Sequence, residues 1–265
     1  MSEKKKQTLP PFTLQVLTTE DLIEGTVEGS TSLYFAGYTN EASRSKTGIS
    51  DANVTPRVVI LDAEVTLWTP IELWLASGMR ALDHAVETLY SSGNHPINDL
   101  LALNAIEALF KYLPHTKNDP DNLDFRQQCQ LAAWMSYFAP ATVSAHAGTS
   151  HTIGKRIGAT YGVPHGVTSS ILLSHVIRSK AIQPEDAVRL KPAAKGLGLI
   201  SDQVSAQDAA KALADAVQRL VRELDLPSHL GDVNVPKSAF ESIAHASASD
   251  EPGRAIVMDI LRRAW

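Results

Sequence analysis

The chain has 265 residues, of which 44% are hydrophobic and 20% charged, and its formal net charge at pH 7 is −5. This acidic balance argues against a nucleic-acid partner, and the single cysteine excludes an intrachain disulfide and a cysteine-rich zinc site. No apolar run approaches the length of a membrane span and the N-terminus lacks a signal-peptide core, so we expect a cytoplasmic protein with no membrane partner.

The first part of the chain favours short strands over helix. Strand-like runs lie at Phe12–Leu17, Thr31–Thr39 and Arg57–Asp62, with a polar link between the second and the third. The third run is the most apolar and is predicted to be a buried strand. We therefore predict a flexible tail over residues 1–11 and a β-rich segment over residues 12–68.

Residues 69–265 are predicted to form an all-helical domain. Thr69 followed by Pro70 is typical of a helix start, and the helix it opens has an apolar face that Gly78 could interrupt. Apolar spacing predicts further helices at 97–113, 121–138, 165–181 and from Ser205 to before Pro227, with two short helices at the end. Cys129 is expected to be buried in one of them.

One stretch, SAHAGTSHTIGKRIGATYGVPHG from Ser144 to Gly166, combines glycines with His151 and His165. Glycines let a backbone approach a ligand or another helix closely. Its helical spacing is interrupted by so many glycines that this segment would be stable only when packed.

A second stretch, GMRALDHAVE from Gly78 to Glu87, places Arg80 and His84 on one helix face, and His151 and Lys155 have the same four-residue spacing. Three imidazoles at His84, His151 and His165 could hold a catalytic metal or transfer protons. A single histidine on a helix is more often structural, and that reading is assigned to His95, His115, His175, His229 and His245.

The string GTSHTIGKRIGATYGVPHG resembles the signature of the iron-containing alcohol dehydrogenase family, and GMRALDHAVETLY resembles its metal-binding segment, most closely in the maleylacetate reductase branch. The resemblance covers residues 12–265 and implies a mostly α fold. That fold is the dehydroquinate synthase-like C-terminal helical domain, with a small N-terminal β appendage as the remnant of the junction with a cofactor domain.

Members of the family carry a nucleotide-binding domain ahead of the helical one, and no segment of that length precedes Thr18. Gly196 and Gly198 are the best substitute for its phosphate-binding glycines, but they do not follow a predicted strand. We therefore expect no cofactor-binding residues and no nicotinamide cofactor on this chain alone.

The resemblance also implies a metal site made of one aspartate and three histidines. His84, His151 and His165 match the histidines, but Arg80 stands where the aspartate is expected. A guanidinium cannot ligate a cation and repels it. No metal is therefore expected, as the resemblance implies for maleylacetate reductases, and the alternative is iron or zinc on the three histidines.

Three functions fit this sequence. The first is redox-neutral chemistry on a small carbonyl or carboxylate substrate, as a lyase or isomerase acting by isomerisation, dehydration, cyclisation or C–C cleavage. Arg80 and Lys155 would stabilise an oxyanion and the three histidines would move protons. The second is an NAD(P)-dependent oxidoreductase of the maleylacetate reductase type, with a cofactor site completed by a partner.

The third function is a non-catalytic binding subunit. A structural alternative also exists for Arg80, which could form an ion pair with Asp83 or Glu87 on the same helix. Strand edges and apolar surface left without the cofactor domain favour self-association, so a homodimer is predicted.

Overall fold

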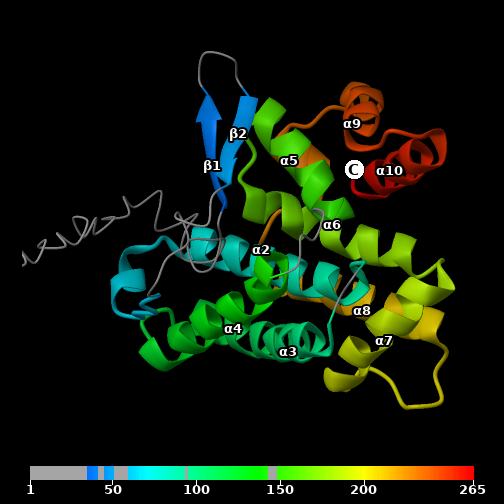
Figure 1. The fold of residues 1–265 in the computed structure, drawn as a ribbon. Helices are drawn as coiled ribbons and strands as arrows, with labels where there is room; N and C mark the ends of the chain where they lie inside the picture. The colour runs from blue at the N-terminus through cyan, green and yellow to red at the C-terminus, as the bar shows by residue number, and fades with distance from the viewer. Residues whose placement is uncertain (1–34, 41–44, 51–58, 93–94, 143–147) are drawn as a thin grey trace, which may run out of the picture.

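The computed structural model describes residues 35–40, 45–50, 59–92, 95–142 and 148–265, with backbone alone for 35–40, 45–50 and 139–142. In chain order the elements are β1 (Phe35–Asn40), β2 (Ser45–Ser50), the 3-10 helix η2 (Val65–Trp68), α2 (Ile71–Tyr90), α3 (Pro96–Asn118), α4 (Leu123–Thr142), α5 (Thr149–Tyr161), α6 (His165–Lys180), α7 (Pro184–Gly196), α8 (Ala206–Glu223), the 3-10 helices η3 (Leu230–Val233) and η4 (Lys237–Ala239), α9 (Phe240–Ser247) and α10 (Glu251–Arg263). Figure 1 shows a helical body with the two strands standing beside it. The predicted fold, mostly α with a small β appendage, is confirmed.

The β appendage differs in detail from the prediction. β1 and β2 pair antiparallel, with Phe35 opposite Ser50 and Asn40 opposite Ser45, so residues predicted to be a polar link form a strand. Backbone hydrogen bonds hold such a ladder without an apolar pattern, which is why the periodicity did not reveal it. The predicted strand at Phe12–Leu17 lies outside the described residues.

The prediction of a buried strand at Arg57–Asp62 is wrong in its described part. Residues 59–62 form no strand, and Ile60 is 81% exposed. The carboxylate of Asp62 accepts a hydrogen bond from the backbone N–H of Glu64, and its carbonyl accepts one from Gln130 on α4. Residues 59–62 are therefore an irregular segment that leads through a turn at residues 63–64 into η2, with Asp62 in contact with α4.

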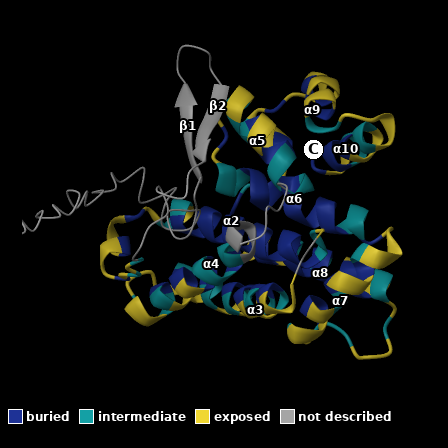
Figure 2. Cartoon of the chain, viewed as in Figure 1, coloured by how far each residue is buried: buried dark blue, intermediate teal, exposed yellow. Residues whose placement is uncertain are grey.

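The central element of the helical body is α2. Every residue from Trp74 to Leu89 is buried, and Figure 2 shows this helix dark along its length, enclosed by its neighbours. It is unbroken at Gly78, where a Cβ would lie 2.3 Å from a methyl group of Leu113, so glycine lets α2 and α3 approach closely. The helix begins one residue later than predicted, with Pro70 in place of Thr69 as the N-cap.

Several helix boundaries near prolines differ from the prediction. α3 continues through Pro114 and α4 through position 140, although the helices predicted there were expected to end at residues 113 and 138. α7, which begins at Pro184 and contains Pro192, was not predicted at all. Interior prolines cost a backbone hydrogen bond, and here the buried faces of these helices outweigh that cost. Cys129 is buried in α4 as predicted, at 4% exposure.

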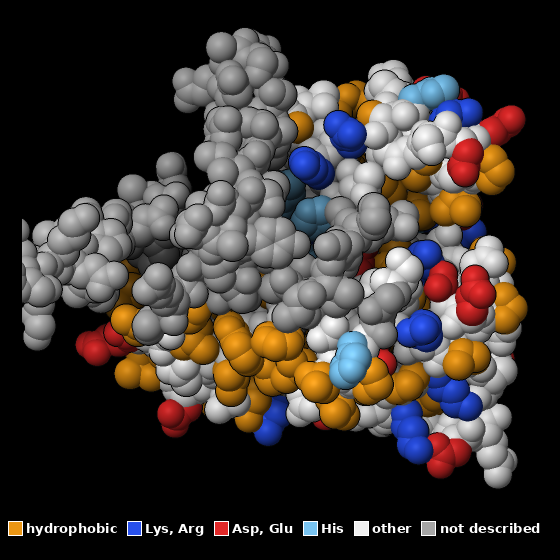
Figure 3. Space-filling model, in the orientation of Figure 1, with side chains coloured by type: hydrophobic (Ala, Val, Ile, Leu, Met, Phe, Trp, Pro, Cys, Tyr) orange, Lys and Arg blue, Asp and Glu red, His pale blue; other side chains and the backbone are white. Residues whose placement is uncertain are grey.

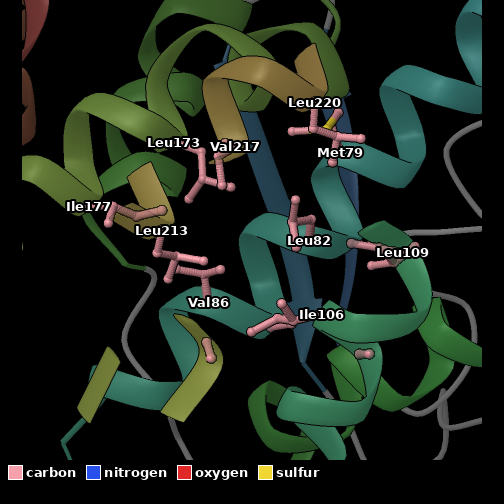
Figure 4. Close-up of a cluster of buried hydrophobic side chains, with 14 of the residues drawn as sticks. Met79, Leu82, Val86, Ile106, Leu109, Leu173, Ile177, Leu213, Val217 and Leu220 are labelled. Atoms are coloured by element: carbon pink, nitrogen blue, oxygen red, sulfur yellow. The ribbon is translucent and has the colours of Figure 1, made fainter. Parts of the chain in front are cut away.

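Two hydrophobic clusters stabilise the body, and α6 contributes to both. The larger cluster joins α2, α3, α6 and α8, where Met79, Leu82, Leu109, Leu173 and Val217 meet (Figure 4). The smaller joins α5, α6, α9 and α10 around Ile153, Ile171 and Ile260. Because α6 belongs to both clusters and packs on α2 and α5, it fixes these two helices relative to each other.

The surface carries hydrophobic side chains on the face made by α3 and α4, as Figure 3 shows. Leu100 on α3 and Leu123 and Leu131 on α4 are each at least 40% exposed. Among the helices that the structure describes, none combines the length and the apolar character needed to cross a bilayer.

Candidate functional site

A stripe of polar side chains runs along the buried helix α2. Asp83 and His84 lie three and four residues after Arg80, and Glu87 lies four and three residues after them, so all four lie on one side of the helix. Each is no more than 8% exposed. Buried polar groups need hydrogen-bond partners, and the neighbouring helices α5 and α6 supply them.

The N-terminal turns of α5 and α6 both face this stripe. α6 can approach α2 because of Gly166, where a Cβ would lie 2.3 Å from the carbonyl oxygen of Ala76. α5 begins after Gly148, which has the same role against Glu87, with a Cβ only 2.0 Å from the carboxyl carbon. These glycines therefore bring the first turns of both helices, with His151 and His165, to the polar side of α2.

The three imidazoles singled out in the sequence lie close together. The ring centroids of His84 and His151 are 5.6 Å apart, and those of His151 and His165 are 6.3 Å apart with nearly parallel planes. His84 also packs edge-on against Tyr137 of α4, at 4.9 Å. The geometry thus places His84, His151 and His165 in one site, while their catalytic roles stay a prediction.

Arg80 is the cation of this cluster. Its Nη2 lies 3.1 Å from Nε2 of His151, and its Nη1 lies 3.1 Å from the hydroxyl oxygen of Ser169 and 3.3 Å from a carboxylate oxygen of Asp83. Because a guanidinium can only donate, Nε2 of His151 must accept. This contact assigns His151 as a neutral imidazole with its proton on Nδ1.

Asp83 neutralises Arg80 in this buried position. The same carboxylate oxygen accepts hydrogen bonds from the hydroxyl groups of Ser150 (2.8 Å) and Ser169 (2.6 Å). Burial raises the pKa of Asp83, although Arg80 and the two serines oppose this shift. The ion pair left open by the sequence is thus present, and it links all three helices of the site.

Glu87 occupies the next turn of α2 and contacts α5. Its Oε1 accepts a hydrogen bond from the backbone N–H of Ser150 at 2.7 Å and another from the hydroxyl of Tyr90 at 3.3 Å. Burial, together with the charge of Asp83, raises the pKa of Glu87 to about 8. This raised pKa favours the protonated form of Glu87 at neutral pH.

His84 is the other imidazole whose protonation state is defined. Burial, the charge of Arg80 and the nearby His165 hold the pKa of His84 well below its usual value. His84 and His151 are thus two neutral imidazoles beside one fixed cation. Neutral imidazoles can accept protons or polarise a carbonyl group, whereas imidazolium ions cannot act as bases.

The contacts of Arg80 disfavour a divalent metal among these residues. Arg80 takes the place of the expected acidic ligand, and its guanidinium uses the Nε2 lone pair of His151 that a metal would need. Within the described ranges, no three histidine, cysteine or carboxylate side chains are arranged to hold a metal ion. Arg80 and a dication would also repel each other at this distance.

The fifth residue predicted for the site, Lys155, follows His151 by one turn of α5 but is exposed, in contrast to Arg80. The sequence analysis missed Ser150, Ser169 and Tyr137, which contact Asp83, Arg80 and His84. A signal was available for two of them, because Ser150 precedes His151 directly and Ser169 follows His165 by one helical turn.

Comparison with known proteins agrees with this architecture. The model of the C-terminal domain of the Fe-containing alcohol dehydrogenase family matches residues 74–257. The chain belongs to this family. The polar stripe, the site histidines His151 and His165, and the two glycines Gly148 and Gly166 all lie inside the matched region.

Individual relatives give the same result. The chain is 31% identical over 219 residues to alcohol dehydrogenase 4 of Schizosaccharomyces pombe, covering 83% of this chain and 50% of the relative. It is 35% identical over 155 residues to maleylacetate reductase of Sphingobium indicum, covering 58% of this chain and 43% of the relative. A solved 1,3-propanediol oxidoreductase superposes with a TM-score of 0.81 at 27% identity, covering 88% of this chain and 62% of the other.

These relatives are oxidoreductases by name, and the chain spans about half the length of the curated ones. The match to the maleylacetate reductase supports the branch indicated by the sequence motif. The similarity therefore establishes the family and the helical domain of this chain.

Proposed function

We propose that this domain binds a small carbonyl or carboxylate compound and acts on it without a divalent metal, using Arg80 and His151 where the family uses a metal ion. The observation that carries the proposal is the bond of 3.1 Å between Arg80 Nη2 and His151 Nε2. It makes a buried cation and a neutral imidazole act as one unit, with the imidazole proton on Nδ1.

The chemistry follows from this unit. Nδ1–H of His151 donates a hydrogen bond to a substrate oxygen as negative charge develops on it, and the positive charge of Arg80 stabilises that charge through the ring. His84, neutral and 5.6 Å from His151 between ring centroids, accepts or returns a proton. Lys155 at the exposed end of the same turn would attract an anionic substrate.

The reaction class we propose first is oxidoreduction of a small alcohol, aldehyde or keto acid, because the relatives are named as alcohol, propanediol and maleylacetate enzymes. In the described residues Gly196 ends α7 and Gly198 follows it, so this glycine pair lies after a helix and does not form a dinucleotide-binding turn. A nicotinamide cofactor does not fit that turn, so NADH or NADPH would have to be bound at a site completed by a partner. The cofactor would give the hydride that reduces the carbonyl group, while His151 or His84 would supply the proton.

The second candidate is redox-neutral proton transfer, as in an isomerase or lyase. Two neutral imidazoles beside a fixed cation favour it, because together they can form and stabilise an enolate without a hydride donor. The two candidates share the same site residues and differ in whether the substrate gains a hydride.

The test is turnover of a panel of small aldehydes, hydroxy acids and keto acids, with and without NADH or NADPH, in the presence of a chelator. We expect activity to survive chelation and to be lost in Arg80→Ala and His151→Ala while circular dichroism shows an intact fold. Lys211→Ala, an exposed change on α8, is the matched control and should keep full activity. Loss of activity on chelation, or full activity of Arg80→Ala, would overturn the proposal.

A further inference from the structure

The start of α5 is held from outside the helix. The first N–H groups of a helix need acceptors, which an N-cap side chain usually supplies. Here the N-cap is Gly148, which has no side chain, and the backbone N–H of Ser150 donates to Glu87 on α2 at 2.7 Å. The acceptor for this helix therefore comes from another helix.

The fit around this contact is tight. A Cβ at position 148 would lie 2.0 Å from the carboxyl carbon and 2.1 Å from a carboxyl oxygen of Glu87. Only glycine leaves room for the carboxyl group at the end of α5. The hydroxyl of Tyr90 donates to the same oxygen that accepts from Ser150, which fixes the orientation of the carboxyl group.

The residue after Ser150 is His151, whose ring must reach Arg80. Glu87 holds the backbone of Ser150, and Asp83, one turn earlier on α2, holds its hydroxyl and also pairs with Arg80. Arg80 is part of α2, and two successive turns of α2 hold Ser150, the residue that precedes His151. α5 contains Gly154 and Gly158, which weaken it as an isolated helix, so its first turn depends on such anchors.

We propose that Glu87 is a positioning residue, which caps α5 through Ser150 and thereby places His151 against Arg80. This inference rests on the proposed function, since it assigns how the proposed catalytic pair is aligned. It predicts that the tautomer of His151, and not only the stability of the fold, depends on the carboxyl group of Glu87.

The experiment is ¹⁵N NMR of the histidine ring nitrogens in the whole chain, with the His151 signals identified by their loss in His151→Gln. In the unchanged protein we expect a single tautomer, protonated on Nδ1. Glu87→Ala and Gly148→Ala should lose this single signal and give mixed tautomers. Glu87→Gln should restore it, because its amide oxygen can still accept from Ser150.

The control is Gly231→Ala, where a Cβ would meet nothing nearer than Trp265 at 3.9 Å. It should keep the tautomer of the unchanged protein. An unaltered His151 signal in either folded Glu87→Ala or folded Gly148→Ala would overturn the inference, and so would a Glu87→Gln variant that behaves like Glu87→Ala. Should the chain prove inactive or metal-dependent, the tautomer readout still reports on positioning, so the two proposals fail separately.

Discussion

Replacing Glu87 with glutamine should change how the stability of the protein depends on pH. The carboxyl group is buried beside Asp83, which raises its pKa from 4.5 to about 8 in the folded state. A raised folded pKa means that the folded state holds its proton more tightly than the unfolded state. The stabilisation from this proton is complete below pH 4.5 and is lost as the pH rises through about 8.

The size of this effect follows from the shift. One pKa unit corresponds to about 1.4 kcal/mol, so the difference between 4.5 and about 8 amounts to a loss on the order of 5 kcal/mol across this range. Glutamine keeps the shape of protonated glutamate and cannot ionise. Glu87→Gln should therefore lose much less stability than the unchanged protein between pH 5 and pH 9.

Urea unfolding followed by circular dichroism at half-unit pH steps measures the two curves. Glu241→Gln, an exposed change on α9, serves as the control and should run parallel to the unchanged protein. The reasoning is refuted if the Glu87→Gln curve also runs parallel, because Glu87 would then ionise in the folded state as it does in the unfolded state.

The remaining predictions concern packing and the cation of the site. Gly166→Ala should destabilise the fold strongly in thermal unfolding, because its Cβ would lie 2.3 Å from the backbone oxygen of Ala76, whereas Gly231→Ala should be tolerated. Leu109→Ala should cost about 2–5 kcal/mol in urea unfolding because Leu109 is fully buried, and Leu100→Ala on the same helix, 63% exposed, should cost far less. Arg80→Asp should gain zinc or iron in elemental analysis while Arg80→Ala should not; equal metal content in the two variants would contradict the proposed role of Arg80.

Local sequence patterns predicted the helical body well because amphipathic spacing and motif glycines both depend on neighbours along the chain. The start of α8 is an example, since Ser205 caps it through a bond from the backbone N–H of Asp208, as its sequence indicates. α4 shows the limit, because it continues past its predicted end at residue 138 and through the proline at position 140. The cost of an interior proline is local, but the packing that offsets it is not.

The candidate site shows the same division. The motifs identified His84, His151, His165 and Arg80, which the structure brings together. They did not reveal that Asp83 and Glu87 hold α5, because those contacts join residues more than sixty positions apart. The apolar run before Asp62 also did not reveal that Ile60 is exposed. A run of apolar residues alone does not show which other part of the chain will cover it.

The central claim is that Arg80 and His151 replace a metal ion, and elemental analysis of the purified chain by plasma mass spectrometry, before and after chelator treatment, tests it most directly. Because Arg80 uses the Nε2 lone pair of His151, we predict far less than one iron or zinc per chain and no change in the His151 tautomer on chelation. Near-stoichiometric metal that chelation removes, with a shift in the His151 signal, would contradict the account.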